Sequence, residues 1–269
     1  MDYKTVKLDR ENGIAILTLN RPETLNAWND EMHRDAIAAL EEIDKDDDIR
    51  VLIITGAGKG FSSGADVSQD FARLRDMPST ETPIGQAILD RPNLVGGVEK
   101  LANLSKPVIA AVNGAAVGAG FSLALACDMR VASDRARFSI NFVKRALAPD
   151  AGGTFLLPRL IGLSQACRLI FTADMLDAEE AKSIGLVDSI IPHENLMSEA
   201  KKLAGRIAEN PPLTVKLAKK LIYQGLVAPN LSAHLTYEVC ANFFLMSTDD
   251  FKESTDSFME KRSPVFKGK

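Results

Sequence analysis

The stretch Pro107-Val108-Ile109-Ala110-Ala111-Val112-Asn113-Gly114-Ala115-Ala116-Val117-Gly118-Ala119-Gly120-Phe121-Ser122 decides the fold class of this chain. Its first six residues form an unbroken apolar run, which is typical of a strand with both faces buried. Asn113-Gly114 interrupts the run, and the small residues that follow lead into an apolar helix pattern that continues to Cys127. A buried strand that passes directly into a helix predicts an α/β fold, with a parallel or mixed sheet covered by helices.

The rest of the chain extends this alternation on both sides of the opening stretch. Residues 68–96 are polar and contain prolines, which predicts a mobile or partly helical excursion. We expect an α/β core at residues 1–200 and a helical C-terminal region at residues 201–269. The expected strands are 5–8, 14–19, 51–55, 107–112, 129–132 and 136–139, with a hairpin turn at Asn12-Gly13. The expected helices are 26–43, 165–172, 178–184, 194–210, 212–226 and one from about 231.

Composition and charge narrow the functional classes. The 269 residues are 46% hydrophobic and 25% charged, which is ordinary for a globular protein. A net charge of −4 argues against a general binder of nucleic acid or of anionic membranes. The three cysteines form no CxxC pair, which favours a reducing compartment over a disulfide framework or a zinc site. With no signal-peptide pattern, and no apolar stretch long enough to cross a bilayer, the predicted location is the cytoplasm.

Asp150 is the acidic residue with the most unusual neighbourhood. It stands in the run Ala148-Pro149-Asp150-Ala151-Gly152-Gly153-Thr154, and apolar residues flank the run on both sides. An aspartate before small residues is a good helix N-cap. The same carboxylate has no obvious cationic partner in the sequence and could instead face a pocket. The residues themselves leave both interpretations open.

Three glycine-rich or polar loops accompany Asp150: residues 20–28, 60–67 and 113–122. Backbone N–H groups beside Gly and Ala are poorly shielded, which is what an oxyanion hole requires, and a helix N-terminus adds favourable partial charge. The alternative for each loop is a tight turn. A dinucleotide site is excluded at Gly118–Gly120, because Leu123 stands where the third glycine of that motif would fall.

Together these segments resemble the crotonase, or enoyl-CoA hydratase/isomerase, superfamily. The resemblance implies a crotonase-like ββα spiral core and an acyl-CoA thioester as substrate. It also implies no separate cofactor, because coenzyme A is part of the substrate, and homotrimers that often pair into hexamers. The motifs that carry it are Leu19-Asn20-Arg21-Pro22, Leu25-Asn26-Ala27, Gly64-Ala65-Asp66, Lys106 to Gly114, Cys127-Asp128, Gly152-Gly153-Thr154 and Gly185-Leu186-Val187.

The resemblance also assigns roles to residues. The N–H groups of Ala65 and Ala119 are expected to bind the thioester oxygen, although relatives usually have glycine at the second position. Arg21 is a candidate for the CoA phosphates, and a structural role for it remains equally open. The residues expected to line the substrate and CoA groove are Leu25, Ala27, Ala65, Asp66, Val67, Gly118, Ser122 and Phe142.

The chain departs from a hydratase at two positions. Hydratases of this family use two glutamates to activate water, and Ser122 and Phe142 stand in their places. Neither side chain can serve as the base for water and the acid for carbon.

Asp150 follows Phe142 by eight residues. In having an acid at this position, the chain resembles enoyl-CoA isomerases and the ring-opening isomerases of phenylacetate degradation. The run 148–159 and the tail 261–269 resemble the second group. We therefore predict an isomerase in which Asp150 takes a proton from one carbon and returns it to another.

Several alternatives remain. An acyl-CoA hydrolase or a residual hydratase could use Ser122 or Asp150 to orient water. An aryl-CoA dehalogenase is disfavoured, because no histidine lies near residues 85–105. A non-catalytic acyl-CoA-binding or RNA-binding homologue is the remaining class. Trp28 is expected in the core or at a pocket edge, Asp66 as a loop cap, and Phe243-Phe244 on a core or a partner subunit.

Overall fold

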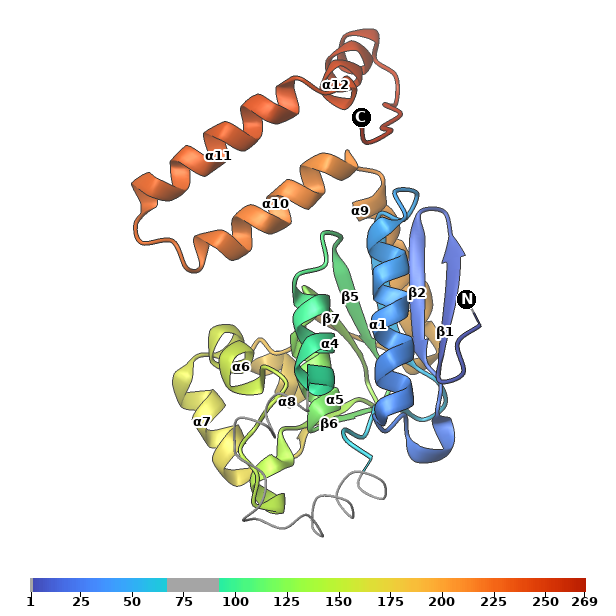
Figure 1. Ribbon diagram of the computed structural model, residues 1–269, viewed down its shortest axis with the longest axis vertical. Helices are drawn as coiled ribbons and strands as arrows, with labels where there is room; N and C mark the ends of the chain where they lie inside the picture. The colour runs from blue at the N-terminus through green and yellow to red at the C-terminus, as the bar shows by residue number, and fades with distance from the viewer. Residues whose placement is uncertain (1, 67–91) are drawn as a thin grey trace.

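The computed structural model describes residues 2–66 and 92–269, and its centre is a mixed sheet of six strands (Figure 1). The strand order is β1-β2-β3-β5-β7-β10. The first two strands pair antiparallel across the turn at Asn12-Gly13, and every later pair is parallel. The strands are β1 Val6–Glu11, β2 Ile14–Leu19, β3 Val51–Gly56, β5 Val108–Val112, β7 Met129–Ser133 and β10 Ser189–Ile191. The predicted α/β class with a mixed sheet is confirmed.

A second, smaller sheet has the order β4-β6-β8-β9. Its strands are β4 Gly60–Ser62, β6 Ala115–Val117, β8 Arg137–Ser139 and β9 Leu176–Asp177. β4, β6 and β8 each follow one strand of the large sheet, and α5, Ala119–Leu125, follows β6. Because β4, β6 and β8 pair parallel to one another, successive units stack in one direction. This repeat is the ββα spiral that the family resemblance implies.

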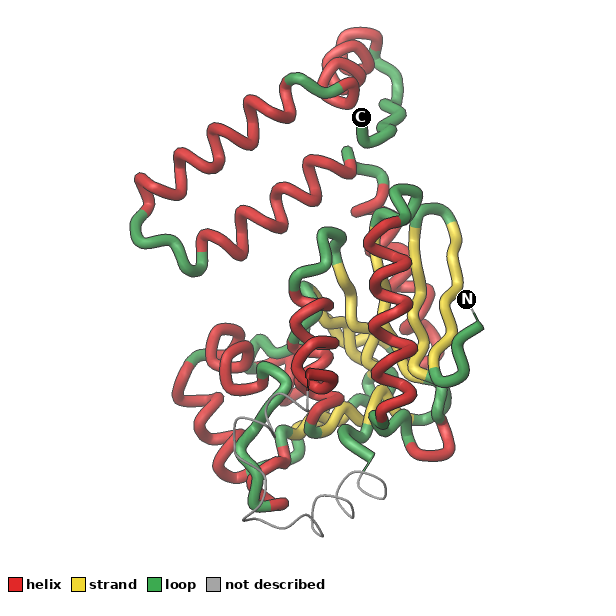
Figure 2. Tube along the Cα trace, viewed as in Figure 1, coloured by secondary structure: helices red, strands yellow, loops and turns green. Residues whose placement is uncertain are grey.

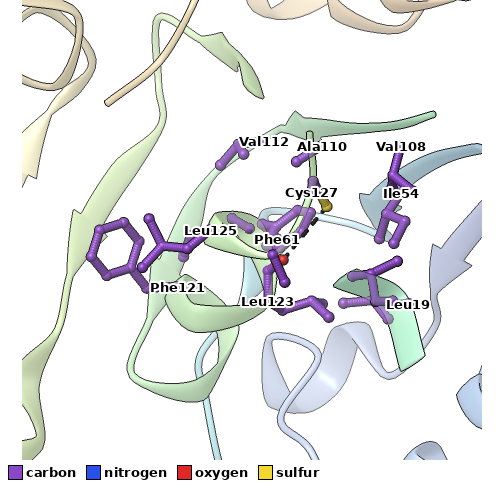
Figure 3. Packing of buried hydrophobic residues seen from close by; sticks show 14 of the residues in the cluster. Leu19, Ile54, Phe61, Val108, Ala110, Val112, Phe121, Leu123, Leu125 and Cys127 are labelled. Carbon is purple, nitrogen blue, oxygen red and sulfur yellow. Dashed lines mark hydrogen bonds between the residues drawn. The ribbon is translucent and has the colours of Figure 1, made fainter. Parts of the chain in front are cut away.

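Alternate residues of the central strands enter two separate hydrophobic clusters. Leu52 and Ile54 of β3 face the larger cluster with α1, Asp30–Lys45, and α5. Val51 and Ile53 face the smaller cluster with α9, Leu196–Ala208. Both faces are thus buried, which explains the continuous apolar runs of these strands. Figure 3 shows the larger cluster, in which the Cys127 thiol donates to the carbonyl of Leu123 at 3.5 Å.

Helix α1 begins at Asp30, four residues later than the periodicity predicts. Asn29 is the N-cap, and its side chain accepts a hydrogen bond from the Met32 amide at 2.9 Å. Leu25 and Asn26 adopt left-handed backbone conformations, and Trp28 pairs with Ala65 as an isolated parallel bridge. The predicted helix start at residue 26 is wrong, because these residues pair with a distant loop.

The structure has a helix where the run around Asp150 ends. α6 spans Gly153–Ile161, and its N-cap is Gly152 in the left-handed conformation, without a side-chain capping bond. The interpretation of Asp150 as a helix N-cap is therefore wrong. The helices that follow are α7 Leu163–Thr172 and α8 Ala178–Ser183, and the short 3-10 helices are η1 Pro22–Thr24, η3 Asn141–Arg145 and η4 His193–Asn195.

The C-terminal helices form an arm that extends away from the two sheets (Figure 1). The arm, which comprises α10 Pro212–Gly225, α11 Leu231–Met246 and α12 Asp249–Glu260, is red to orange there. Figure 2 shows helix throughout it apart from short connections and the tail. The expected boundary at residue 200 falls inside α9, which packs on the large sheet. None of the described helices is long and apolar enough to cross a membrane.

Candidate active site

A cleft opens where the N-terminus of α1, the loop after β4, α4 (Pro92–Ala102) and α5 meet. The space between these elements, including the open mouth, is about 540 Å³. Most residues that line the cleft are apolar. The polar ones, Asn29, Asp30 and His33, belong to the start of α1. The lining residues are Trp28, Asn29, Asp30, His33, Ala65, Gly97, Val98, Ala119, Leu123 and Ala151.

The backbone around Ala65 is held by its two neighbours. The Trp28 amide donates to the carbonyl of Gly64 at 2.8 Å, and the Asp66 amide donates to the carbonyl of Trp28 at 2.7 Å. Because N–H groups alternate in direction along an extended strand, the Ala65 N–H points away from Trp28. No described residue accepts a hydrogen bond from it. This leaves a donor at the cleft wall.

Ala119 supplies a second backbone donor at the same cleft. It is the first residue of α5, where N–H groups have no partner within the helix, and no described residue accepts its hydrogen bond. Its φ is not positive, so alanine fits this position without backbone strain. The two loops approach closely at Gly64: a Cβ there would lie 2.8 Å from the carbonyl oxygen of Val117 and 3.3 Å from the Ala119 nitrogen. Gly64 thereby allows the loops that carry Ala65 and Ala119 to meet.

Asp150 is exposed, and the next residue in the chain, Ala151, lines the cleft. The backbone carbonyl of Asp150 accepts two hydrogen bonds, from the Gly153 amide at 3.0 Å and from the Ser122 hydroxyl at 3.2 Å. Ala151 adopts a positive φ of 50°. The turn that carries the carboxylate is therefore fixed through its backbone to α5 and α6.

Buried side chains occupy the two positions at which the family resemblance places the glutamates of hydratases. Ser122 is fully buried beneath the turn of Asp150 and donates its hydroxyl hydrogen bond there. Phe142 is 9% exposed and belongs to the larger hydrophobic cluster. Neither residue is among those that line the cleft.

Arg21 and Asp66 form a buried ion pair, with Nη2 and Oδ2 3.0 Å apart. Arg21 Nη1 also donates to the carbonyl of Ala27 at 2.6 Å. With both ends of its guanidinium engaged, Arg21 fixes the loop 20–28 rather than offering a free charge to a phosphate. Asp66 is 5% exposed and holds that loop from the other side through its ion pair with Arg21.

The other residues expected to line the groove include Leu25, Ala27 and Gly118, and none of these three is among the residues that line the cleft. Leu25 is 42% exposed, while Ala27 is buried beside the Arg21 contact. Gly118 precedes α5 with a φ of 54°. Val67 lies outside the described residues. The structure thus gathers Ala65 and Ala119 at one cleft, together with Ala151, the residue that follows Asp150.

Sequence reasoning placed Trp28 at a core or pocket edge, where it lies, and gave His33 no role. His33 sits in the second turn of α1, is 6% exposed and lines the cleft. Its ring meets the Trp28 indole edge-on, with centroids 6.3 Å apart. Burial lowers the pKa of this imidazole, which favours its neutral form. The apolar periodicity of α1 places residue 33 on the buried face of the helix, and this periodicity is the feature of the sequence that could have pointed to His33.

Comparisons with known proteins agree with this geometry. Residues 9–269 match the sequence profile of the family described as enoyl-CoA hydratase/isomerase. The chain is 39% identical to a short-chain-enoyl-CoA hydratase of Clostridium acetobutylicum, over 97% of each chain. It is also 39% identical to a 1,2-epoxyphenylacetyl-CoA isomerase of Escherichia coli, over 96% of this chain and 97% of that protein. The crystal structure of an enoyl-CoA hydratase from Bacillus anthracis superimposes with a TM-score of 0.90 at 34% identity, covering 99% and 100% of the two chains.

The ββα spiral and its cleft define a protein of the crotonase superfamily. Within that superfamily, the chain belongs to the enoyl-CoA hydratase/isomerase family. Relatives named as a hydratase and as an isomerase are equally similar to it, so identity alone does not choose between the two reactions.

Proposed function

We propose that this chain is an acyl-CoA isomerase that moves a proton on an enoyl- or ring-epoxide acyl-CoA. In the enoyl case, the Asp150 carboxylate removes a proton from the carbon next to the thioester of a 3-enoyl-CoA. The electron pair moves into the thioester carbonyl, and the N–H groups of Ala65 and Ala119 stabilise the resulting dienolate oxygen. The protonated Asp150 then returns its proton to the far end of the dienolate, which yields the 2-enoyl-CoA.

The observation that carries the proposal is the contact between Ser122 and Asp150. Ser122 stands where a hydratase has a glutamate, and its buried hydroxyl donates to the carbonyl of Asp150. The serine supports the turn that presents Asp150 and is buried away from any water that would attack the substrate. With Phe142 buried at the second glutamate position, no carboxylate pair is available there to add water.

The two backbone donors account for much of the expected rate. Removal of one oxyanion-hole donor costs other enzymes about 2.7–4 kcal/mol of transition-state stabilisation. A positioned base contributes on the order of 10²–10⁴-fold. A proton shift needs these two features and no separate cofactor, in keeping with coenzyme A being part of the substrate.

The test is Asp150→Asn, assayed with a 3-enoyl-CoA in heavy water by mass spectrometry. We expect isomerisation and deuterium incorporation to fall on the order of 10²–10⁴-fold while acyl-CoA binding is retained. Asp9→Asn, an exposed substitution on β1, is the control that keeps full activity. Among the described residues that line the cleft, Asp30 carries a carboxylate and is therefore an alternative base. Asp30→Asn tests this alternative.

Two results would overturn the assignment. Undiminished isomerisation in Asp150→Asn, or a loss of that size in Asp30→Asn alone, would remove Asp150 as the base. Net addition of water to a 2-enoyl-CoA by the unaltered protein would favour the hydratase, and release of free CoA would favour the hydrolase.

We also propose that the arm packs against further copies of this chain, as a homotrimer or a pair of trimers. No residue of α10 or α11 is buried in the single chain. Large apolar side chains are exposed along the arm, among them Leu231 at 72%, Phe243 at 70% and Phe258 at 82%. Exposed apolar surface of this kind is typical of protein–protein contacts.

A further inference from the structure

The hydroxyl of Ser62 lies where the two segments that carry the proposed oxyanion donors meet. Ser62 is the last residue of β4, three residues before Ala65, and is fully buried. Gly120, the residue after Ala119 in α5, comes so close that a Cβ there would lie 2.6 Å from the Ser62 Oγ. The hydroxyl therefore adjoins both the loop that leads to Ala65 and the start of α5.

The Ser62 hydroxyl makes two hydrogen bonds in this place. It donates to the carbonyl of Asn26 at 2.8 Å and accepts from the Gly64 amide at 3.3 Å. Asn26 is itself held firmly, because its side chain donates to the carbonyls of Ala57 and Gly60 at 3.0 and 2.8 Å. Ser62 thereby connects the backbone of Gly64 to a part of the fold that is already fixed.

Gly64 is the residue whose rotation would move the Ala65 N–H. Its φ is 93°, and it has no Cβ to restrict its backbone. The peptide unit after Gly64 contains the Ala65 N–H, and the carbonyl of that unit accepts from the Trp28 amide at 2.8 Å. The peptide unit before Gly64 is held by the bond from its N–H to Ser62. Because peptide units are planar, fixing both of them fixes the direction of the Ala65 N–H.

We infer that Ser62 is a positioning residue, whose hydroxyl aims the N–H of Ala65 at the thioester oxygen. This inference rests on the proposed function for the role of Ala65, and it names a side chain on which that role depends. Without the hydroxyl, the amide of Gly64 loses its partner and the glycine gains freedom to rotate. The proposed donor would then leave the position in which it stabilises developing charge. Ser62 does not line the cleft, so the surface that receives the acyl-CoA would be unchanged.

Ser63 offers a matched control at the next position. Its hydroxyl also joins this loop to the segment before Trp28, by donating to the carbonyl of Thr24 at 3.0 Å. Ser63 is half-buried, and the Gly64 amide bonds to Ser62 rather than to Ser63. Ser62→Ala and Ser63→Ala therefore remove the same group from adjacent residues, and the first of them alone releases Gly64.

The test is infrared spectroscopy of bound hexanoyl-CoA with a ¹³C-labelled thioester carbonyl, because hydrogen bonds lower the carbonyl stretching frequency. We expect a lowered frequency in the unaltered protein and in Ser63→Ala. Ser62→Ala should lose about half of this shift, since one of the two donors is displaced. Turnover of a 3-enoyl-CoA should fall on the order of 10–100-fold in Ser62→Ala, while affinity for hexanoyl-CoA changes by less than about threefold.

Ser62→Cys tests whether a similar group rescues the loss. A thiol is a weaker donor and acceptor than a hydroxyl, so this variant should keep a carbonyl shift and a turnover between those of Ser62→Ala and the unaltered protein. If Ser62→Ala does not fold, Ser62→Cys provides the comparison. A shift and turnover equal to those of the unaltered protein would then contradict the inference, since a weaker partner should hold Gly64 less firmly.

The remaining outcomes separate this inference from the proposed function. An unchanged carbonyl shift in Ser62→Ala would show that Gly64 stays in place without the hydroxyl. An equal loss in Ser63→Ala would show that Ser62 has no particular role. Either result overturns the inference and leaves the proposed function standing. Absence of a shift in the unaltered protein would overturn the proposed oxyanion hole and this inference with it. Hexanoyl-CoA is saturated and does not isomerise, so the infrared result is independent of Asp150 as the base.

Discussion

At the scale of single residues, His33 links the cleft to the stability of the fold. Burial lowers the pKa of its imidazole below the usual 6.5, the nearby Arg34 lowers it further, and Asp30 opposes both effects. The unfolded chain therefore binds a proton at His33 at a higher pH than the folded chain does. The stability that depends on neutral His33 is fully present above pH 6.5 and declines as the pH falls below it toward the folded pKa.

His33→Leu should remove this part of the pH dependence. We expect the free energy of unfolding to fall less in the variant than in the unaltered protein between about pH 8 and pH 5, because the variant has no imidazole to protonate. Urea unfolding at the two pH values measures the difference, and the remaining titrating groups contribute to both proteins. The same drop in both proteins would show that the cleft does not oppose protonation of His33.

At the scale of elements, the contact between β4 and α5 sets the position of the proposed oxyanion donors, the N–H groups of Ala65 and Ala119. Gly120 of α5 lies against Ser62 of β4 so closely that a Cβ would fall 2.5 Å from the Ser62 carbonyl oxygen and 2.6 Å from its Oγ. Real Cβ atoms do not approach so closely, so the backbone would have to move. Such a shift would separate the loops that carry Ala65 and Ala119.

Gly120→Ala is therefore expected to destabilise the protein by about 1–3 kcal/mol and to reduce turnover more than substrate affinity. The matched control is Gly205→Ala in α9, where a Cβ would meet no atom within 4 Å. Removing a helical glycine there should stabilise the protein by about 0.5–1 kcal/mol and leave activity unchanged. Thermal unfolding and steady-state kinetics compare the two variants; similar behaviour of both would contradict the close contact at Gly120.

Elements that depend on local periodicity could be predicted, and elements that depend on distant pairing could not. β2 has the predicted bounds, and β3, β5 and β7 are within one residue, because strands buried on both faces must be apolar throughout. The start of α1 was wrong because Asn26 donates to the carbonyls of Ala57 and Gly60, more than 30 positions away. No window of sequence contains that contact.

The candidate site was predictable to a similar degree. Glycine and alanine composition pointed to the loops of Ala65 and Ala119, and the structure brings both loops to one cleft. His33 escaped notice because a histidine on the buried face of a helix resembles an ordinary core position. Its place in the cleft lining and its unpartnered Nε2 depend on packing between distant elements, which only the folded structure shows.

At the scale of the whole molecule, the arm is attached to the core by a few polar contacts at its base. Lys219 and Tyr223 of α10 both reach Asp128, at 2.8 and 2.7 Å, and Lys219 also donates to the carbonyl of Lys106 at 3.0 Å. Beyond this base, α10 packs mainly on α11, as Figure 1 shows. Phe243 and Phe244 are thus not part of the core of their own chain, and in the proposed assembly we expect them to contact another copy of the chain.

The double variant Phe243→Asp/Phe244→Asp tests that contact. On a surface that faces only water, such substitutions change stability by no more than about 0.5 kcal/mol and leave the mass of the particle unchanged. If other copies cover the arm, the buried aspartates lack partners and the assembly dissociates. We expect light scattering to give three or six times the 29.1 kDa chain mass for the unaltered protein and a smaller particle for the variant.

Lys7→Asp, an exposed substitution on β1, is the control that keeps the larger mass. A mass of one chain for the unaltered protein would contradict the proposed assembly, and an unchanged mass for the double variant would place its interface away from these two residues.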